Sequence, residues 1–436
     1  MKNKFPDKVE DLGIVGCGGA GFPTHVKLSA KDVTCFIVNA AECEPLLHKD
    51  KEILKHHTAD FFKGLETAMS MTGAKVTHIA VKEKYSELIS QLKSFCSNPK
   101  ISVFPLGDFY PSGDEFELVY EITKKLIPFG GIPLQIGCVV NNVETLLHLG
   151  RGKPFTSKFL TVAGAVPKPV SIEVPLGITV REAISLSGQI DLCDMAIIDG
   201  GPMMGRIVSP ENLVTKTCGG LVVLPKEHPL IVKMTRPARR NQLIGRAGCD
   251  QCTDCTELCP RRLLGYPIRP HKAMRTNLFT RGDSSDYSLE SIFCSECGVC
   301  SLFACPEALP PREVTIIAKR YHLSHGAKLS DWQGVPQVHP MRPGRRIGIQ
   351  RLINCLGLTE FDRKAPLIQA KIDPPHVRLP LKMNLGAPAQ PSVKVGDDVT
   401  TGQLIGIIPE RSLGANLHAS ISGRVVSIDD AITIEA

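Results

Sequence analysis

Eight of the 16 cysteines lie in one short segment, arranged as two groups of four. Each group has three cysteines separated by two residues, then a fourth cysteine followed at once by proline. Three thiolates at this spacing let one loop wrap three irons of a 4Fe-4S cube. The segment therefore predicts two 4Fe-4S clusters and electron transfer. The candidate ligands are Cys249, Cys252, Cys255, Cys259, Cys294, Cys297, Cys300 and Cys305.

The fourth cysteine of each group, Cys259 or Cys305, is expected to reach the cube held by the other group, as in bacterial ferredoxins. The second group has one extra residue before its last cysteine, which we expect to bulge the loop without changing the order of ligands. The alternative is a pair of four-cysteine zinc sites in a non-enzymatic zinc-binding or scaffold protein. Zinc requires neither a third cysteine at this C-x2-C spacing nor the proline, so clusters are the favoured interpretation.

The composition is that of a folded protein that does not depend on disulfides. With 436 residues, 43% of them hydrophobic, the chain can bury several cores. The net charge of +7 favours an anionic ligand or an acidic partner, while 5% aromatic residues argue against nucleic acid. The first residues lack an apolar signal region, and no apolar run approaches the roughly 20 residues of a transmembrane helix. We expect a soluble, cytoplasmic protein with no transmembrane segment.

A second candidate site is the glycine-rich stretch GCGGAGFPTH, which begins at Gly16. Closely spaced glycines let the backbone approach a phosphate, and free N–H groups at a helix start attract its charge. Two polar segments, NAAECEP from Asn39 and NNVET from Asn141, each follow a strand-like run. Ligands bind at such strand ends in α/β sheets. The alternative for each segment is an ordinary turn or helix cap.

In this order, the three segments resemble those of the flavoprotein subunit of respiratory complex I and of the C subunit of the Rnf electron-transport complex. The resemblance implies a fold that binds FMN and NADH. Phe22 and Glu44 would lie towards the nicotinamide nucleotide. The residues that would contact FMN are Gly16, Gly18, Gly19, Gly21, Lys27, Asn39, Glu42, Asn141, Asn142 and Thr145. The middle segment of that family, an aromatic residue and then Gly-acid-acid, is matched by Tyr110, Gly113, Asp114 and Glu115.

The match has three departures from complex I. Cys17 stands where complex I has arginine, His25 replaces a glycine, and Ala41 replaces an aspartate of the flavin site. The resemblance assigns no catalytic residue.

The elements that must position these groups alternate between strand and helix in the first 150 residues. Strand-like runs begin at Val33, Lys75 and Ile101, and one helix is predicted over 53–71, which indicates an α/β domain over residues 1–152. Short strands with Pro and Gly turns follow, with a helix near 180–187 and a strand at 195–199. These predict a small α+β domain over residues 153–232.

The rest of the chain divides into three further parts. A two-cluster domain is expected over residues 233–320, and a connector with one helix, 348–356, over residues 321–375. Residues 376–436 read as a small all-β module with Gly-Asp and Ser-Gly turns. By resemblance, residues 153–232 are similar to a soluble-ligand-binding β-grasp domain, and the tail is similar to the barrel-sandwich modules related to lipoyl and biotinyl domains. Ser422-Gly423-Arg424 stands where those modules carry a modified lysine, so neither lipoyl nor biotin is expected.

The fold class is therefore multidomain α/β, with a complex I flavoprotein-like FMN fold, a β-grasp domain, a ferredoxin-like two-cluster helical segment and a C-terminal barrel-sandwich hybrid. A flavin fold at the start and a barrel-sandwich module at the end resemble, over nearly the whole chain, the cobalamin reductases of propanediol-utilisation microcompartments. That resemblance implies an NADH-dependent oxidoreductase that passes electrons through FMN and two 4Fe-4S clusters to cobalamin and so reactivates a B12-dependent enzyme.

The same resemblance implies partners and a location. The partners would be a B12-dependent enzyme or its adenosyltransferase, and shell proteins, inside a bacterial microcompartment. The alternative in the same class is an Rnf-type subunit that exchanges electrons between NADH and ferredoxin or another carrier. Basic stretches at residues 236–246 and 342–351 flank the cluster segment. They are either solvated connector surface or a docking patch for an acidic redox partner or for the phosphate of a corrinoid.

Overall fold

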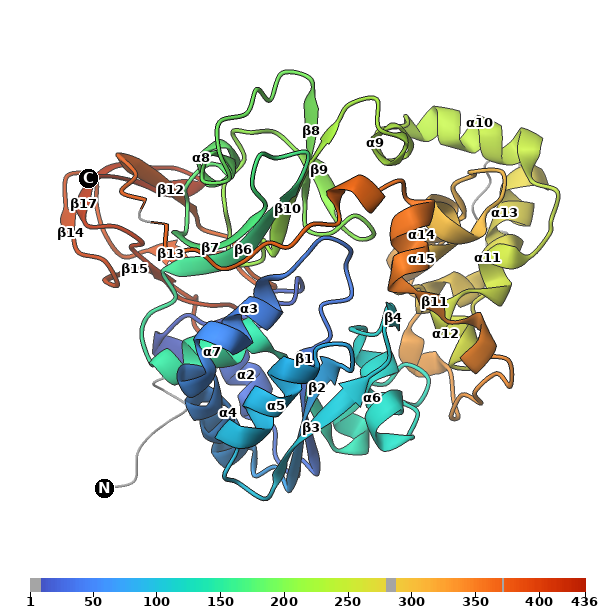
Figure 1. Cartoon of the computed structure of the whole chain (residues 1–436), viewed down its shortest axis with the longest axis horizontal. Coiled ribbons are helices and arrows are strands. Elements are labelled where there is room, and N and C mark those ends of the chain that lie inside the picture. The colour runs from blue at the N-terminus through green and yellow to red at the C-terminus, as the bar shows by residue number, and fades with distance from the viewer. Residues whose placement is uncertain (1–8, 280–287, 371) are drawn as a thin grey trace.

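The computed structural model describes residues 9–279, 288–370 and 372–436. Figure 1 shows an α/β unit that carries the N-terminal third of the chain, with a second, mixed sheet packed above it. The C-terminal β module lies on one side of that mixed sheet, and the helical segment with the eight cysteines lies on the other (Figure 1). In the described residues, no helix combines the length and apolar character needed to cross a membrane.

The first sheet is parallel, in the order β3-β2-β1-β5. Alternate side chains of β1 face opposite ways: Phe36 and Val38 join the core beneath five helices, α2, α3, α4, α5 and α7, whereas Cys35 and Ile37 join the core beneath α6. Both faces are therefore buried, as a parallel sheet requires. The elements are α2 (Thr24–Leu28), β1 (Cys35–Ala40), α3 (Lys49–His56), α4 (Thr58–Thr72), β2 (Val76–Lys82), α5 (Ser86–Phe95), β3 (Ile101–Leu106), β4 (Phe109–Tyr110), α6 (Glu115–Thr123), η1 (Pro133–Ile136), β5 (Cys138–Asn142) and α7 (Val143–Arg151).

The prediction of a single helix over 53–71 is wrong, because α3 ends and α4 begins around His57 (φ −125°, ψ 34°). The His57 ring packs edge-on against Phe159, with 5.5 Å between ring centroids. The Thr58 hydroxyl donates to the carbonyl of Leu54 at 2.7 Å. The apolar periodicity continues across the break, so the pattern identified the buried face but not the bend.

The second sheet has the order β7-β6-β10-β8-β9, in which only β6 and β10 are parallel. One face shares a continuous core with α8 and the C-terminal module, and the other packs against α9, α15 and the cysteine segment. A capping box between Thr179 and Glu182 begins α8. The elements are β6 (Ser157–Gly164), β7 (Val170–Pro175), α8 (Val180–Ser185), β8 (Met195–Asp199), β9 (Arg206–Val208), β10 (Gly220–Pro225) and α9 (Pro229–Met234).

The cysteine segment is built of short helices around the two groups of cysteines. The extra residue before Cys305 is accommodated by a π-helical turn, η4, as the expected bulge requires. The elements are α10 (Ala238–Gly248), α11 (Asp254–Glu257), α12 (Pro260–Leu263), α13 (Pro270–Phe279), η3 (Leu289–Phe293), η4 (Cys300–Ala304), α14 (Pro311–Ser324), η5 (Leu329–Asp331) and η6 (Pro343–Arg345).

The chain then returns across the molecule before it forms the C-terminal module. Strand β11 (Ile347–Gly348) pairs with β4 of the first unit, and α15 (Ile349–Cys355), close to the helix predicted at 348–356, packs on the second sheet. Two small sheets then follow η7 (Thr359–Phe361), in the orders β12-β18-β17-β14 and β13-β15-β16. Their strands are β12 (His376–Pro380), β13 (Gln390–Pro391), β14 (Asp398–Val399), β15 (Leu404–Ile407), β16 (Leu417–His418), β17 (Gly423–Ile428) and β18 (Ala431–Glu435).

Candidate functional site

The glycine-rich loop presents free backbone donors. Gly18, Gly19 and Ala20 are exposed, and no hydrogen bond joins their N–H groups to any of the described residues. The base of the loop is held by the N–H of Cys17, which donates to the Thr145 hydroxyl at 2.9 Å. Gly19 has φ 112°, and a Cβ there would meet open space within 4 Å. Consecutive free N–H groups on an open loop form a ready site for an anion.

The two predicted polar segments meet at the end of the parallel sheet. Asn39 on β1 lies beside Asn142 on β5, and Val38 lies beside Asn141. Asn142 caps α7 through the N–H of Glu144 at 2.9 Å, so the helix-cap alternative is correct for that residue. Asn141 is buried, and its Nδ2 has no hydrogen-bond partner among the described residues. A buried amide left without an acceptor indicates a ligand at this point.

Glu42 lies in a strained backbone conformation next to these strand ends. Its φ is 37°, a value that non-glycine residues rarely adopt and that concentrates at functional sites. Its carboxylate accepts from the N–H groups of Asp50 at 2.8 Å and Lys51 at 3.4 Å. Burial and the neighbouring Asp50 raise the pKa of Glu42 to about 7. Nearby, Lys27 Nζ donates to Glu115 at 3.1 Å and to the Val140 carbonyl at 2.6 Å.

The middle segment docks onto the end of β1. Asn39 Nδ2 donates to the Gly113 carbonyl at 2.8 Å, and a Cβ at Gly113 would lie 3.1 Å from Cys43 Sγ. Asp114 caps α6 and also forms an ion pair with Arg261 of the cysteine segment at 3.0 Å. The predicted site residues from the loop, both strand ends and the middle segment thus surround one end of the sheet. Of these residues, Asp114 also faces the cysteines.

Glu44 and Tyr110 connect this site to the cysteine segment. The Tyr110 hydroxyl donates to the Cys297 carbonyl at 2.8 Å and lies 3.4 Å from Glu44 Oε1. The N–H of Met203 donates to Glu44 Oε2 at 2.9 Å, and a Cβ at Gly201 would collide with the Glu44 side chain. Burial raises the pKa of Glu44 to about 7, although the Met203 N–H and the Tyr110 hydroxyl favour the ionised form. The sequence pointed to both residues but contained no signal for the contact of Tyr110 with Cys297.

The eight cysteines fall into two sets that lie side by side. The Cys249 set consists of Cys249, Cys252, Cys255 and Cys305, and the Cys294 set consists of Cys259, Cys294, Cys297 and Cys300. Within each set the thiols lie close enough to raise one another's pKa, and Cys255 of the other set also raises the pKa of Cys300. All four cysteines of the Cys249 set line one small cavity of about 20 Å³. These are the two sets that the ferredoxin-like spacing predicts.

The backbone explains how each loop aims its thiols inward. Gln251 and Thr253 in the first loop, and Glu296 and Gly298 in the second, all have positive φ between 61° and 82°. This repeated left-handed turn wraps both loops in the same way. Backbone N–H groups also donate to sulfur, from Glu296 to Cys294 at 3.3 Å and from Leu309 to Cys305 at 3.4 Å. Hydrogen bonds of this kind raise the reduction potential of a cluster.

The cysteine sets fit cubes of iron and sulfur. Among the described residues, no three His, Cys, Asp or Glu side chains converge as the ligands of one metal ion do. A cube is wider than one ion, and each of its four irons takes a single thiolate. Burial raises the pKa of Cys255 and of Cys297 to about 12, so these thiols need the positive charge of the irons to become thiolates.

A buried ion network beneath the glycine loop was not predicted. Glu144 is fully buried, and its carboxylate accepts from Lys49 Nζ at 2.9 Å, from Lys158 Nζ, and from the N–H of Phe159 at 2.9 Å. Burial alone would raise the pKa of Glu144, but the two ammonium groups outweigh it and hold that pKa well below its ordinary value. The signal in the sequence is a lysine directly before the apolar run of β6, at Lys158. The network fixes the start of α7 under the loop.

Three parts of the chain match known domain families. Residues 9–151 match the Nuo51 FMN-binding domain, residues 248–310 match the 4Fe-4S dicluster domain, and residues 359–436 match the RnfC barrel sandwich hybrid domain. The chain therefore has an FMN-binding domain, a 4Fe-4S dicluster domain and a barrel-sandwich domain within a multidomain α/β fold.

Curated relatives match over most or all of the chain. The chain is 39% identical to the cobalamin reductase PduS of Salmonella typhimurium, over 99% of this chain and 96% of that protein. It is 38% identical to the cobalamin reductase PduS of Citrobacter freundii, over 98% and 95%. It is 32% identical to the C component of the Na(+)-translocating ferredoxin:NAD(+) oxidoreductase complex of Acetobacterium woodii, over 64% and 62%. A solved NAD+-reducing NiFe hydrogenase aligns with a TM-score of 0.49 at 21% identity, over 77% of this chain and 62% of that one.

Proposed function

Since the chain belongs to the family of the cobalamin reductases, we propose that it transfers electrons from NADH to cobalamin by way of FMN and two 4Fe-4S clusters. When bound, FMN accepts electrons as a pair and the clusters carry them singly. The residues of the chain hold these groups in place, exclude water, and hold or release protons.

The observation that carries this proposal is the contact made by Tyr110. Its hydroxyl joins Glu44, which we propose faces the nicotinamide nucleotide, to the backbone of Cys297 in the Cys294 set. The ion pair between Asp114 and Arg261 ties the same two parts together a second time. Both contacts are short and lie at the boundary between the two sites, so they hold the flavin end against one cluster.

For FMN, we propose that the loop around Gly18 and Gly19 holds the phosphate and that Asn141 contacts the flavin. The free N–H groups of the loop and the unpartnered Nδ2 of Asn141 support these roles. Phe22 and Glu44 are proposed to face the nicotinamide nucleotide. The remaining FMN contacts are proposed at Gly16, Gly21, Lys27, Asn39, Glu42, Asn142 and Thr145, with Tyr110, Gly113, Asp114 and Glu115 as the middle segment.

We propose that the cluster of the Cys294 set receives electrons first and that the cluster of the Cys249 set delivers them. The first part is supported by the contact of Cys297 with Tyr110 and by Gly298, which packs against the Met203 carbonyl. The second is supported by Cys252, which is exposed, whereas Cys297 and Cys300 are buried. An exposed cluster edge is where an acceptor approaches.

The division of the chain is proposed as FMN/NADH-binding domain 1–152, β-grasp domain 153–232, two-cluster domain 233–320, connector 321–375 and barrel-sandwich module 376–436. The mixed five-stranded sheet with α8 supports the β-grasp assignment. Cytoplasmic location inside a microcompartment, and contact with shell proteins, a B12-dependent enzyme or its adenosyltransferase, are proposed from the family. Co-purification of these partners from intact compartments tests that part.

The activity is tested on protein purified anaerobically. We expect a brown protein from which FMN can be extracted. NADH should bleach its colour, and the protein should reduce cob(III)alamin in an NADH-dependent reaction. Ferredoxin and flavodoxin serve as competing acceptors. Reduction of ferredoxin without reduction of cobalamin would instead favour the Rnf-type exchange, and a colourless protein containing zinc would exclude both.

The order of the clusters is tested with two serine variants of cysteines. In Cys252→Ser, electron paramagnetic resonance should still show one cluster that NADH reduces. In Cys297→Ser, the remaining cluster should be reducible by dithionite but not by NADH. If instead the NADH-reducible cluster survives only in Cys297→Ser, the proposed order is reversed.

A further inference from the structure

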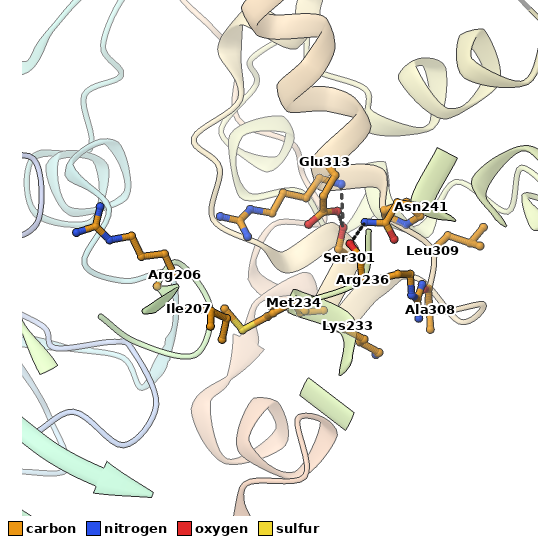
Figure 2. A pocket seen from close by; sticks show the side chains of 14 residues that line it. Arg206, Ile207, Lys233, Met234, Arg236, Asn241, Ser301, Ala308, Leu309 and Glu313 are labelled. Carbon is orange, nitrogen blue, oxygen red and sulfur yellow. Dashed lines mark hydrogen bonds between the residues drawn. The ribbon is translucent and has the colours of Figure 1, made fainter. Parts of the chain in front are cut away.

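A cavity of about 240 Å³ lies between the second sheet and the cysteine segment. Figure 2 shows Arg206 and Ile207 on one side of it, Lys233 and Met234 from the end of α9, and Glu313 opposite. The loop that supports Glu44 ends at this cavity: Gly205 lines it and donates its N–H to the Gly201 carbonyl at 2.8 Å. Sites that enclose a whole small ligand measure roughly 300–1,000 Å³, so this cavity suits one part of a larger ligand.

The wall on the cysteine side reaches both cluster sets. Ser301 directly follows Cys300, and its hydroxyl donates to Glu313 at 2.8 Å. Leu309 lines the same cavity and donates its N–H to Cys305 Sγ at 3.4 Å. A group bound here therefore lies within a few atoms of ligands from both sets.

Of the cationic side chains that line the cavity, Lys233 and Arg312 are available to a ligand, whereas Arg206 and Arg236 are not. Arg206 is paired with Asp199 at 3.2 Å, and its side chain points away from the cluster side (Figure 2). Arg236 donates to the Ala308 carbonyl at 3.2 Å. The structure records no ion-pair partner for Lys233 within the ranges it describes.

Arg312 is the second available cation. Its Nε is buried without an acceptor, and no carboxylate lies within ion-pair distance of it in the described part of the chain, although its charge also acts on Glu44 and Cys294. The one carboxylate in the lining, Glu313, already accepts from Ser301. The lining is thus cationic, with a buried guanidinium donor that still requires an acceptor, and this combination selects an anion.

We propose that this cavity binds the phosphodiester of the corrinoid acceptor, with Lys233 and Arg312 as its cationic contacts. The inference rests on the proposed function, since it names where that acceptor is held. Apolar side chains near the cavity are unusually exposed: 51% for Met204, 37% for Ile207 and 48% for Val232. These side chains offer an apolar surface to the macrocycle, which is too large to enter. A dinucleotide also carries phosphate esters, so the test separates the two sources.

The test measures binding to the oxidised holoenzyme, without NADH, so that no turnover occurs. Dissociation constants are measured for hydroxocobalamin, for cobinamide, which lacks the phosphodiester and nucleotide, and for NAD+. The variants are Lys233→Gln, Lys233→Arg and Arg312→Gln. The control is Lys168→Gln, which removes an exposed lysine between β6 and β7, outside the cavity. Flavin and iron content, measured for every variant, and NADH-dependent ferricyanide reduction by Lys168→Gln establish that the proteins are folded and loaded.

We expect Lys233→Gln and Arg312→Gln each to weaken hydroxocobalamin binding about tenfold, the cost of one charge-assisted hydrogen bond. Cobinamide binding should be unchanged, and Lys233→Arg should restore most of the affinity. Equal losses for cobalamin and cobinamide, or no loss for either, would overturn the inference while cobalamin reduction by the wild type still stood. Weakened NAD+ binding with unchanged cobalamin binding would assign the cavity to the dinucleotide instead. A wild-type protein that neither binds nor reduces cobalamin would overturn the inference and the proposed function together.

Discussion

At the scale of single residues, two carboxyl groups with raised pKa values lie near the proposed flavin site. Glu42 and Glu44 both titrate near pH 7, because burial disfavours their charged forms. A group that changes charge near neutral pH can hold or release the proton that accompanies electron transfer. Glu44 also contacts Tyr110, so its charge is sensed at the boundary with the cysteine segment.

Glu44→Gln tests the charge at this boundary. In the wild type, the carboxylate forms as the pH rises through about 7. At the proposed nicotinamide site, its negative charge would oppose the phosphates of NADH. We expect the KM for NADH to rise several-fold between pH 6 and 8 in the wild type and to stay level in Glu44→Gln. The pKa of Glu44 is about 4.5 in the unfolded chain and about 7 in the folded protein, so the unfolded chain loses this proton first as the pH rises. The free energy of unfolding therefore falls between about pH 4.5 and pH 7. Identical profiles for the two proteins would assign the titration to another group.

Tyr110→Phe removes one hydroxyl from the same boundary. The Cys297 carbonyl loses its donor, so we expect the free energy of unfolding to fall by about 1–2 kcal/mol. The hydroxyl also lowers the pKa of Glu44, so the midpoint of the NADH pH profile should move upward. Tyr120→Phe is the matched control, because its hydroxyl makes no hydrogen bond to the residues described. Equal effects of the two substitutions would contradict the role of Tyr110.

At the scale of elements, helices α4 and α7 lie in direct backbone contact beneath the parallel sheet. A Cβ at Gly64 would lie 1.8 Å from the Leu146 carbonyl oxygen, and a Cβ at Gly150 would lie 1.8 Å from the Asp60 carbonyl oxygen. Both glycines are therefore required by close approach and not by backbone conformation. This contact places the start of α7, with Asn142 and Thr145, at the glycine loop.

Gly64→Ala should destabilise the protein, although alanine normally favours a helix by about 1 kcal/mol over glycine. The new methyl group must push α7 away, and overpacking of this kind costs about 1–3 kcal/mol. Urea unfolding measures the change. The control is Gly344→Ala, because a Cβ at Gly344 meets open space and should change stability by less than about 0.5 kcal/mol. A stabilised Gly64→Ala protein would show that the helices separate freely.

At the scale of the whole molecule, Lys216 joins three parts of the chain. Its buried ammonium donates to the Gly13 carbonyl of the first unit and to the Asn416 carbonyl of the C-terminal module, each at 2.8 Å. Burial lowers its pKa to about 7, even though nearby Cys17 opposes that shift. The Leu385 N–H also donates to the Gly21 carbonyl at 3.0 Å. The C-terminal module therefore closes over the glycine loop.

Lys216→Met should change how stability depends on pH. The pKa is about 7 in the folded protein and about 10.5 when unfolded, so the unfolded chain binds more protons between these values. The contribution of Lys216 to stability is then fully present above that window and is lost as the pH falls towards 7. We expect the unfolding midpoint of the wild type to rise with pH from 7 to 9.5 relative to Lys216→Met. Lys168→Met should follow the wild type; if Lys216→Met does so as well, the ammonium is not buried in solution.

The sequence alone determined the features that depend on neighbours in the chain. The cysteine spacing and the proline after each group predicted the cluster sets, because one loop must wrap one cube. Polar residues at Asn39 and Asn141 predicted a ligand edge, because both lie at the ends of buried strands of a parallel sheet. The helix break at His57 escaped prediction, since the apolar periodicity continues across it and His57 packs against Phe159, about a hundred positions away.

Only the tertiary structure decided which cysteine set lies against the FMN-binding domain. The two groups have nearly the same spacing, so nothing local distinguishes them, whereas the Tyr110 hydroxyl contacts Cys297 across 187 positions. The same holds for the buried pairing of Glu144 with Lys158, for Lys216 and for the cationic cavity. Each is formed by residues from separate parts of the chain, and the strength of its charge interactions depends on how deeply those residues are buried. Because burial depends on how the units pack, those charges acquire their roles only in the folded molecule.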